Sequence, residues 1–381
     1  MRKTNFHHCV LVLAVILMAI PASYFILGKL FPSLAPPQLE VRKTYQKPER
    51  PVDSASIMGQ LTLLTRSIQS QVRQFDKEYR INFPFRSYLL GTYQFQKETL
   101  LRADPYPQKV FEGKQNWLFI GNSFNNTVYE SIGVTQLPVQ QLLRIKHKLE
   151  GYYAWCKRNK IRFYFMPVPE KQTVFARFYP IRPTGQLSVL QQVVVALGPN
   201  PGFLINVSDT LCRDARKALY APTDTHWTGL GAYIAYSTML NTIKLDFPAA
   251  RLLKPGEITL DTAFNTQGDL SKMLFRPKTD TLVFLNPALT KTTKLHQKIK
   301  PPKTRNQNFI EVYEQRHSSG ANKLKAMIYR DSFFVQLATC TNESFGETIL
   351  LWDFRLDTTA IKAEKPDIVI LECAERMVDE L

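Results

Sequence analysis

The stretch Lys323-Leu-Lys-Ala-Met-Ile-Tyr-Arg-Asp-Ser-Phe333 indicates the fold more clearly than any other part of the chain. Its first seven residues are typical of a short buried strand, and the polar residues that follow predict a turn that carries Ser332. In open α/β sheets, ligands bind at the edge where parallel strands end. The stretch therefore predicts a sheet of this kind with a hydroxyl group at its functional edge.

Helical and strand patterns alternate on both sides of this stretch. Helices are expected at 138–157, 187–197 and 228–244, and strands at 161–167, 203–207, 324–329, 348–352 and 367–372. The strands are short, continuous apolar runs, as expected when helices cover both faces of a sheet. The pattern predicts the α/β class, with an α/β/α sandwich around a mainly parallel sheet. Residues 276–322 lack strong periodicity and are rich in lysine, so they are expected to form a basic excursion that could contact a polymer.

The N-terminal region predicts a membrane anchor. Cys9 to Leu27 has no charged residue and would span about 28 Å as a helix, which is close to the thickness of a bilayer core. Arg2 and Lys3 precede it, so the following residues are expected on the exported side of the inner membrane. A cleaved signal peptide is the alternative. We expect an anchor at 1–31, a proline-rich spacer at 32–55, a helical segment at 56–109 and the main domain at 110–381.

The composition of the 381-residue chain limits the classes of function. An apolar content of 44% is ample for a packed core. The net charge of +17 favours an anionic partner, either a membrane surface or a polymer, although no nucleic-acid-binding module is recognisable. Cys156, Cys212, Cys340 and Cys373 permit three disulfide pairings and lack the CxxC spacing of a metal site, so no metal and no cofactor is expected.

Asp224-Thr-His-Trp227 supplies what a reactive serine requires. A serine hydroxyl needs an imidazole to accept its proton and a carboxylate to orient that imidazole. We predict that Ser332 is the nucleophile, His226 the base and Asp224 the orienting carboxylate. Asp331 is the competing carboxylate, but a residue adjacent to Ser332 on an extended turn should point away from the serine side chain.

Three further residues are candidates for substrate binding. Trp227 is predicted either to pack in the core or to form a wall of the pocket. Arg330 borders the nucleophile, and Asn122 follows the Trp117-Leu-Phe strand, so each has either a structural or a binding role. The main-chain N–H of Ser332 is the expected first donor to an oxyanion.

Several segments together resemble the alginate O-acetyltransferase family of the AlgJ and AlgX type, which has an SGNH-hydrolase-like domain. The resemblance runs from about Phe75 to Met377, although Asn116 stands where the family has glycine. An Asp-x-His-Trp segment that precedes Asp-Ser-Phe is the reverse of the order in ordinary SGNH enzymes. The matching segments are Asn82–Arg86, Gly113–Phe119, Pro169–Phe175, Asp224–Trp227, Gly268–Leu270, Arg330–Phe333 and Glu375-Arg376.

The resemblance implies a membrane-anchored periplasmic enzyme that O-acetylates an exported polysaccharide. Acetyl groups would come from a multipass membrane acyltransferase, and the acceptor would be a polysaccharide, with the basic charge favouring an anionic one. Two alternatives use the same fold. One is a secreted carbohydrate or lipid esterase with the same Ser-His-Asp triad, and the other is a glycan-binding assembly protein without activity.

Overall fold

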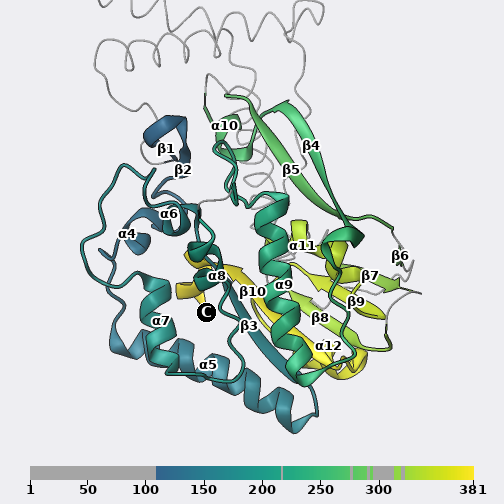
Figure 1. Ribbon diagram of the computed structural model, residues 1–381. Coiled ribbons are helices and arrows are strands. Elements are labelled where there is room, and N and C mark those ends of the chain that lie inside the picture. Colours follow the sequence, from purple (N-terminus) through teal and green to yellow (C-terminus); the bar gives the residue numbers. More distant parts are fainter. Residues whose placement is uncertain (1–108, 216–217, 275–277, 290–291, 295–312, 319–321) are drawn as a thin grey trace, which may run out of the picture. The chain divides into compact units, whose positions relative to one another are not determined.

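The computed structural model describes residues 109–215, 218–274, 278–289, 292–294, 313–318 and 322–381 (Figure 1). The predicted anchor at Cys9–Leu27, the proline-rich spacer and the helical segment up to residue 108 lie outside these ranges. None of the described helices is both long enough and apolar enough to cross a membrane.

A six-stranded sheet forms the middle layer, in the order β3-β10-β8-β9-β7-β6. The first four of these strands are parallel, whereas β7 and β6 continue the sheet with antiparallel pairings. The predicted α/β class with a mainly parallel sheet is confirmed. The strands of this sheet are β3 (Arg162–Val168), β6 (Thr292–Lys294), β7 (Tyr313–Ser318), β8 (Lys325–Tyr329), β9 (Glu347–Leu351) and β10 (Ile368–Ala374).

Helices cover both faces of the sheet, so the central strands are buried on both sides. In β10, Ile368 and Ile370 pack into one hydrophobic cluster, and Val369 and Leu371 pack into the other. One face is covered by α8 (Val207–Arg213), α9 (Gly229–Asp246) and α11 (Val335–Asn342), and the other by α5 (Val139–Arg158), α7 (Val189–Leu197) and α12 (Thr358–Glu364). Three layers result, as predicted (Figure 1).

The remaining elements lie outside the main sheet. Of these, β1 and β2 form a small hairpin, so the predicted strand after Gly113 pairs with β1 and does not join the main sheet. Besides β4 (Ile258–Thr266) and β5 (Asp280–Pro287), the elements outside the main sheet are β1 (Val110–Glu112), β2 (Leu118–Ile120), α4 (Thr127–Ser131), α6 (Lys171–Val174), α10 (Asp269–Lys272) and the 3₁₀ turns η2 (Lys114–Asn116), η3 (Pro255–Glu257) and η5 (Glu375–Glu380).

Two predictions about secondary structure are wrong. The strand expected at 203–207 is a single bridge between Phe165 and Leu204, because the Asn206 side chain accepts from Asp209 N and begins α8. Residues 276–322 contain more than a loop, since β5 (Asp280–Pro287) pairs with β4 (Ile258–Thr266) in an antiparallel hairpin. Most residues of β4 are exposed, so its sequence lacks the alternation that marks a half-buried strand.

The four cysteines of the described residues are free thiols. Cys156, Cys340 and Cys373 are buried, and Cys212 is exposed. Burial raises the pKa of the Cys156 and Cys340 thiols to about 12. These two groups are therefore neutral parts of the core at physiological pH.

Replacing Ile370 with alanine should lower the free energy of unfolding by about 2–5 kcal/mol, because this side chain is fully buried in a central strand. The matched control is Val195→Ala on α7, where the side chain is 66% exposed, and its change should stay within ~0.5 kcal/mol. Chemical denaturation of the full chain measures both values. Equal, small losses in both variants would contradict a core centred on β10.

Candidate active site

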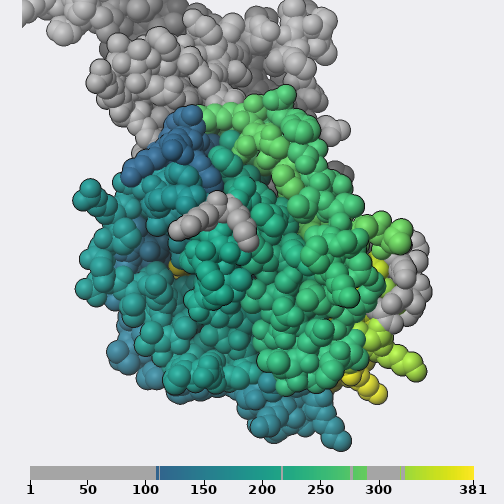
Figure 2. Space-filling model, viewed as in Figure 1, coloured from purple at the N-terminus to yellow at the C-terminus, as the bar shows by residue number. Residues whose placement is uncertain are grey.

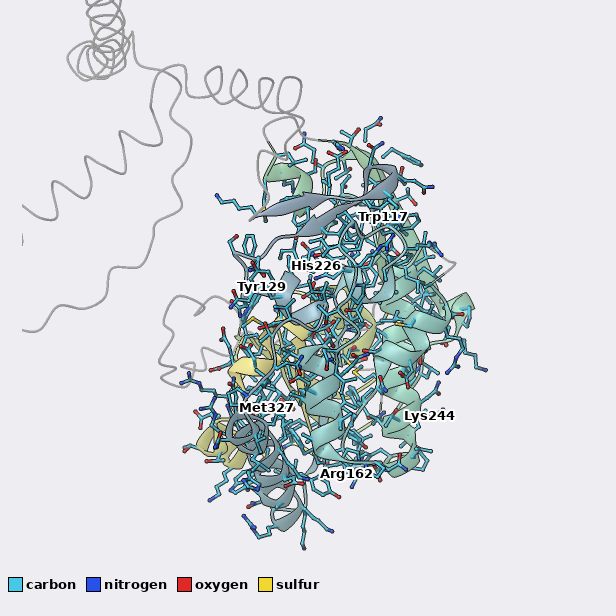
Figure 3. The ribbon with its side chains drawn as sticks, turned by 90° about the vertical axis from the view of Figure 1, so that its left-hand side faces the viewer. Trp117, Tyr129, Arg162, His226, Lys244 and Met327 are labelled. Carbon is cyan, nitrogen blue, oxygen red and sulfur yellow. The ribbon has the colours of Figure 1, made fainter. Side chains whose placement is uncertain are left out.

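The candidate site lies at the carboxyl ends of the parallel strands. Ser332 follows the end of β8, and His226 lies in the loop just before α9. Figure 3 shows His226 in the upper half of the domain and Arg162, the first residue of β3, in the lower half. This is the edge at which ligands bind in open α/β sheets, as the sequence predicts.

The structure brings the three predicted residues into one hydrogen-bonded chain. His226 Nε2 lies 2.9 Å from Ser332 Oγ, and His226 Nδ1 lies 2.8 Å from Asp224 Oδ1. An imidazole held in this way presents Nε2 as the acceptor of the serine proton when Nδ1 carries the hydrogen. The arrangement is that of a Ser-His-Asp triad.

Main-chain hydrogen bonds hold the Asp224 carboxylate in place. Its Oδ1 also accepts from His226 N at 2.9 Å, and its Oδ2 accepts from Asp269 N at 3.0 Å. Burial favours the neutral carboxyl group, but the hydrogen bonds and the charge of the imidazolium outweigh burial and lower the pKa of Asp224 below its usual range. Asp224 is therefore ionised at neutral pH.

A second carboxylate, from Asp269, lies beside the same imidazole. Asp269 Oδ2 is 3.6 Å from His226 Nδ1, and Oδ1 accepts from Thr225 N at 2.6 Å. Burial lowers the pKa of His226, whereas the hydrogen bond to Asp224 and the charge of Asp269 raise it, and the net shift is upward. Gly268 allows the main chain before Asp269 to lie close to the segment that carries Asp224, since a Cβ at residue 268 would lie 2.3 Å from Thr223 O. The sequence offered Gly268-Asp269-Leu270 as a matching segment but assigned it no role.

Asp331 faces the main chain and not the imidazole. Its Oδ1 accepts from Phe333 N at 2.8 Å, and its Oδ2 accepts from Ala374 N at 2.7 Å. Asp331 N in turn donates to Glu372, whose pKa is raised well above normal by burial and by the charge of Asp331. Asp224 therefore contacts His226, whereas the hydrogen bonds of the Asp331 carboxylate go to the main chain; the role of Asp224 as the orienting carboxylate stays a prediction. Ser332 N has no hydrogen-bond partner among the described residues.

A buried lysine that the sequence did not single out supports the loop before α9. Lys171 is 1% exposed, and its Nζ donates to three carbonyl oxygens, those of Ala221, Pro222 and Asp224, at 3.0, 3.2 and 2.7 Å. Burial lowers the pKa of Lys171 to about 7. The three carbonyls converge on one ammonium group, which fixes the segment that carries Asp224. The sequence places Lys171 in the matching segment Pro169–Phe175 but gives no local signal for this role.

Trp227 packs in the core and also borders the cavity at the site, and a role in substrate binding stays a prediction. It is 2% exposed, and its Nε1 donates to Phe333 O at 3.1 Å, so it packs in the core and fixes the residue next to Ser332. It also lines the cavity at the site.

Arg330 and Asn122 do not line this cavity. Arg330 is buried, donates to Asp331 O at 3.1 Å and lies over the ring of Trp352. Asn122 Oδ1 accepts from Tyr129 N at 3.2 Å. The contacts of both side chains fit the structural alternative, and a substrate-binding role for them stays a prediction.

A cavity of about 220 Å³ opens beside the Ser332 hydroxyl. One wall comes from β5 of the hairpin, which lies directly on the start of α9, because a Cβ on Gly229 would be 2.8 Å from the main chain of Phe284. In Figure 2 the hairpin and α9 form the green, right-hand part of the face in view. The lining residues are Ala221, Asp224, His226, Trp227, Thr228, Leu282, Val283, Phe284, Ser332, Val335 and Gln336.

Among the described residues, Asp224 and His226 of the loop before α9 and Asp269 at the start of α10 form a cluster that could bind a cation. The candidate ligand atoms of Asp224, His226 and Asp269 lie within 4.8 Å of one another. Hydrogen bonds account for this spacing, because Asp224 accepts from His226 N and Asp269 N, and Asp269 Oδ1 accepts from Thr225 N. The cluster has the chemistry of an imidazole held by carboxylates. That the protein needs no cofactor stays a prediction.

The fold and the site geometry define an SGNH-hydrolase-like domain. Residues 110–307 match the family model described as "SGNH hydrolase-like domain, acetyltransferase AlgX". The chain belongs to this family of AlgJ/AlgX-type O-acetyltransferases, as the sequence motifs predict. The matched segment contains Asp224 and His226 and ends before Ser332, so the position of the hydroxyl comes from the structure.

Solved structures include chains that are similar to this one at low sequence identity, and the fold is shared with Bacillus cereus PatB1. Bacillus cereus PatB1 has a TM-score of 0.53 and 16% identity, over 71% of this chain and 96% of its own. The O-acetyltransferase domain of Pseudomonas putida AlgJ has a TM-score of 0.46 and 15% identity, over 72% and 93% of the two chains. No curated protein matches the sequence.

Replacing Asp269 with asparagine should shift the titration midpoint of His226 to lower pH. The substitution removes one negative charge that stabilises the imidazolium but keeps an oxygen that can accept from Thr225 N. NMR of ring-labelled histidine measures the midpoint, and Asp209→Asn on the exposed side of α8 serves as the control. A midpoint that is the same in both variants would contradict an electrostatic role of Asp269.

Proposed function

We propose that this protein transfers an acetyl group through Ser332 to a hydroxyl group of an exported polysaccharide. The observation that favours this function most is the hydrogen-bonded chain Asp224–His226–Ser332 at the carboxyl edge of the sheet, in a chain of the acetyltransferase family. The family supports O-acetyltransferase activity in general. The roles of these three residues and the acceptor are our proposals.

In the first step, His226 Nε2 takes the proton of the Ser332 hydroxyl while Oγ bonds to the carbonyl carbon of the acetyl donor. The tetrahedral intermediate then loses the donor alcohol, which receives the proton from His226, and an acetyl-serine remains. In the second step, His226 takes the proton of a sugar hydroxyl, the new ester bond forms, and the Ser332 oxygen recovers its proton. Asp224 stabilises the imidazolium that forms in each step.

The main-chain N–H of Ser332 is our candidate for the first oxyanion donor. It has no partner among the described residues, so it is available to a developing negative charge. Losing one such donor typically costs about 3 kcal/mol of transition-state stabilisation.

The family resemblance and the N-terminal sequence are the support for a proposal on the acetyl donor and the location. We propose that a multipass membrane acyltransferase supplies the acetyl groups and that the N-terminal segment anchors the enzyme in the inner membrane, with its catalytic domain in the periplasm. The basic charge of the chain would attract an anionic polymer or membrane surface.

Hydrolysis is a second candidate activity, because solvent reaches the base. The His226 side chain is 25% exposed, so water can compete with a sugar hydroxyl for the acyl group. Turnover of an acetyl ester with and without an acceptor oligosaccharide separates the two activities. If the acceptor oligosaccharide changes neither the rate nor the products of ester turnover, the result would favour an esterase.

Replacing Ser332 with alanine should lower the acyl-transfer rate by at least ~10³-fold, because it removes the nucleophile of a triad. The melting temperature should change little, since the deleted hydroxyl bonds the partly exposed imidazole and not the core. The control is Ser208→Ala on α8, which should leave the rate unchanged. Retained activity in Ser332→Ala would contradict the assigned role and favour an assembly protein or a different nucleophile.

A further inference from the structure

Gln336 lines the cavity beside Ser332 and has no role in the proton transfers of the triad. It lies at the start of α11, four positions after Ser332. The chain between them is already coiled, because Val335 N donates to Ser332 O at 3.2 Å and Phe334 has helical main-chain angles. Side chains four positions apart lie on the same side of a helix, and each leans toward the start of the helix. The Gln336 side chain is therefore directed over the turn that carries Ser332.

The side-chain amide of Gln336 is held by β5. Leu285 N donates to Gln336 Oε1 at 3.1 Å, and Thr339 Oγ1 donates to Leu285 O at 3.0 Å. A main-chain N–H can donate only to the oxygen of an amide, so the contact with Leu285 determines which end of the Gln336 amide carries the hydrogens. Gln336 Nε2 donates to no acceptor among the described residues. Its N–H groups are therefore the part of this amide that can bind a ligand in the cavity.

An amide NH₂ group has two donors and no acceptor, so its partner must be an oxygen with a free lone pair. The carbonyl oxygen of an acyl group at Ser332 is such an oxygen. When Ser332 Oγ bonds to the carbonyl carbon, one electron pair of the C=O bond moves to this oxygen, which becomes an anion. A donor already positioned there stabilises the anion more than the uncharged ester, and this difference lowers the barrier.

On the basis of the acyl transfer proposed at Ser332, we infer that Gln336 is a catalytic residue whose Nε2 donates to the carbonyl oxygen of the acyl group. It is the second oxyanion donor, beside Ser332 N. When the intermediate collapses, the C=O bond forms again, the alcohol leaves with the proton from His226, and the negative charge at the two donors is lost. The contact between Leu285 and Gln336 holds the amide in place before the reaction, so the hairpin positions a catalytic group as well as forming a wall.

Variants of Gln336 and Thr339 in the full-length protein separate this role from support of the hairpin. Gln336→Glu keeps an oxygen that can accept from Leu285 N but loses the donor, whereas Thr339→Val loses the other contact with Leu285 and keeps the donor. With p-nitrophenyl acetate, kcat/KM reports the acylation of Ser332. It should fall by roughly 10²-fold or more in Gln336→Glu and by less than ~3-fold in Thr339→Val.

An ester with sulfur in place of the carbonyl oxygen gives a measurement that depends on the donor itself. Sulfur accepts hydrogen bonds weakly, so p-nitrophenyl thionoacetate should gain little from Gln336 Nε2. The ratio of kcat/KM for the acetate to that for the thionoacetate should therefore fall by ~10-fold or more in the uncharged variant Gln336→Met. The ratio should stay unchanged in Thr339→Val, because a displaced hairpin would slow both esters alike.

Two results would overturn the inference while leaving acyl transfer intact. One is acylation of Ser332 that is as fast in Gln336→Glu and Gln336→Met as in the unaltered protein. The other is a loss of rate in the Gln336 variants with an unchanged oxygen-to-sulfur ratio, which would make Gln336 a support of the hairpin. Gln336→Glu, which keeps the contact with β5, decides between these results if Gln336→Met does not fold. An unaltered protein that never carries acetyl on Ser332, as measured by peptide mass spectrometry, would instead contradict the proposed function.

Discussion

The hydrogen bond of 2.9 Å between His226 Nε2 and Ser332 Oγ joins two segments that are 106 positions apart in the chain. It forms because β8 and the loop before α9 both end at the carboxyl edge of the parallel sheet. The imidazole can accept the serine proton only if its other nitrogen is held by Asp224. The cavity, the hairpin wall and the proposed acyl chemistry all depend on this alignment.

Buried polar groups keep the two segments in register. The Lys171 ammonium binds three carbonyls of the loop that carries Asp224. Burying charge opposes folding, as the lowered pKa of Lys171 and the raised pKa of Glu372 indicate. These hydrogen bonds set the position of the main chain, because hydrogen bonds to charged groups are shorter and stronger than those between neutral groups. The site therefore rests on a framework that apolar residues of similar size would not reproduce.

The sequence predicted those features that depend on strong local patterns. Continuous apolar runs identified β3, β8, β9 and β10, and Asp224-x-His226 together with Ser332 identified the hydrogen-bonded chain. The hairpin of β4 and β5 was missed because most of β4 is solvent-exposed and lacks a clear alternation. Asp269 and Lys171 were missed as parts of the site because their contacts arise from tertiary packing, and neither residue type is unusual in its local sequence.

Covalent labelling with a sulfonyl fluoride, followed by peptide mass spectrometry, tests most directly whether His226 activates Ser332. We expect a single adduct on Ser332 in the full-length protein and a labelling rate that falls by at least ~10²-fold in His226→Gln, because the serine then lacks its base. An adduct on a different residue, or equal labelling of Ser332 in the two proteins, would contradict the activation of this hydroxyl by the imidazole.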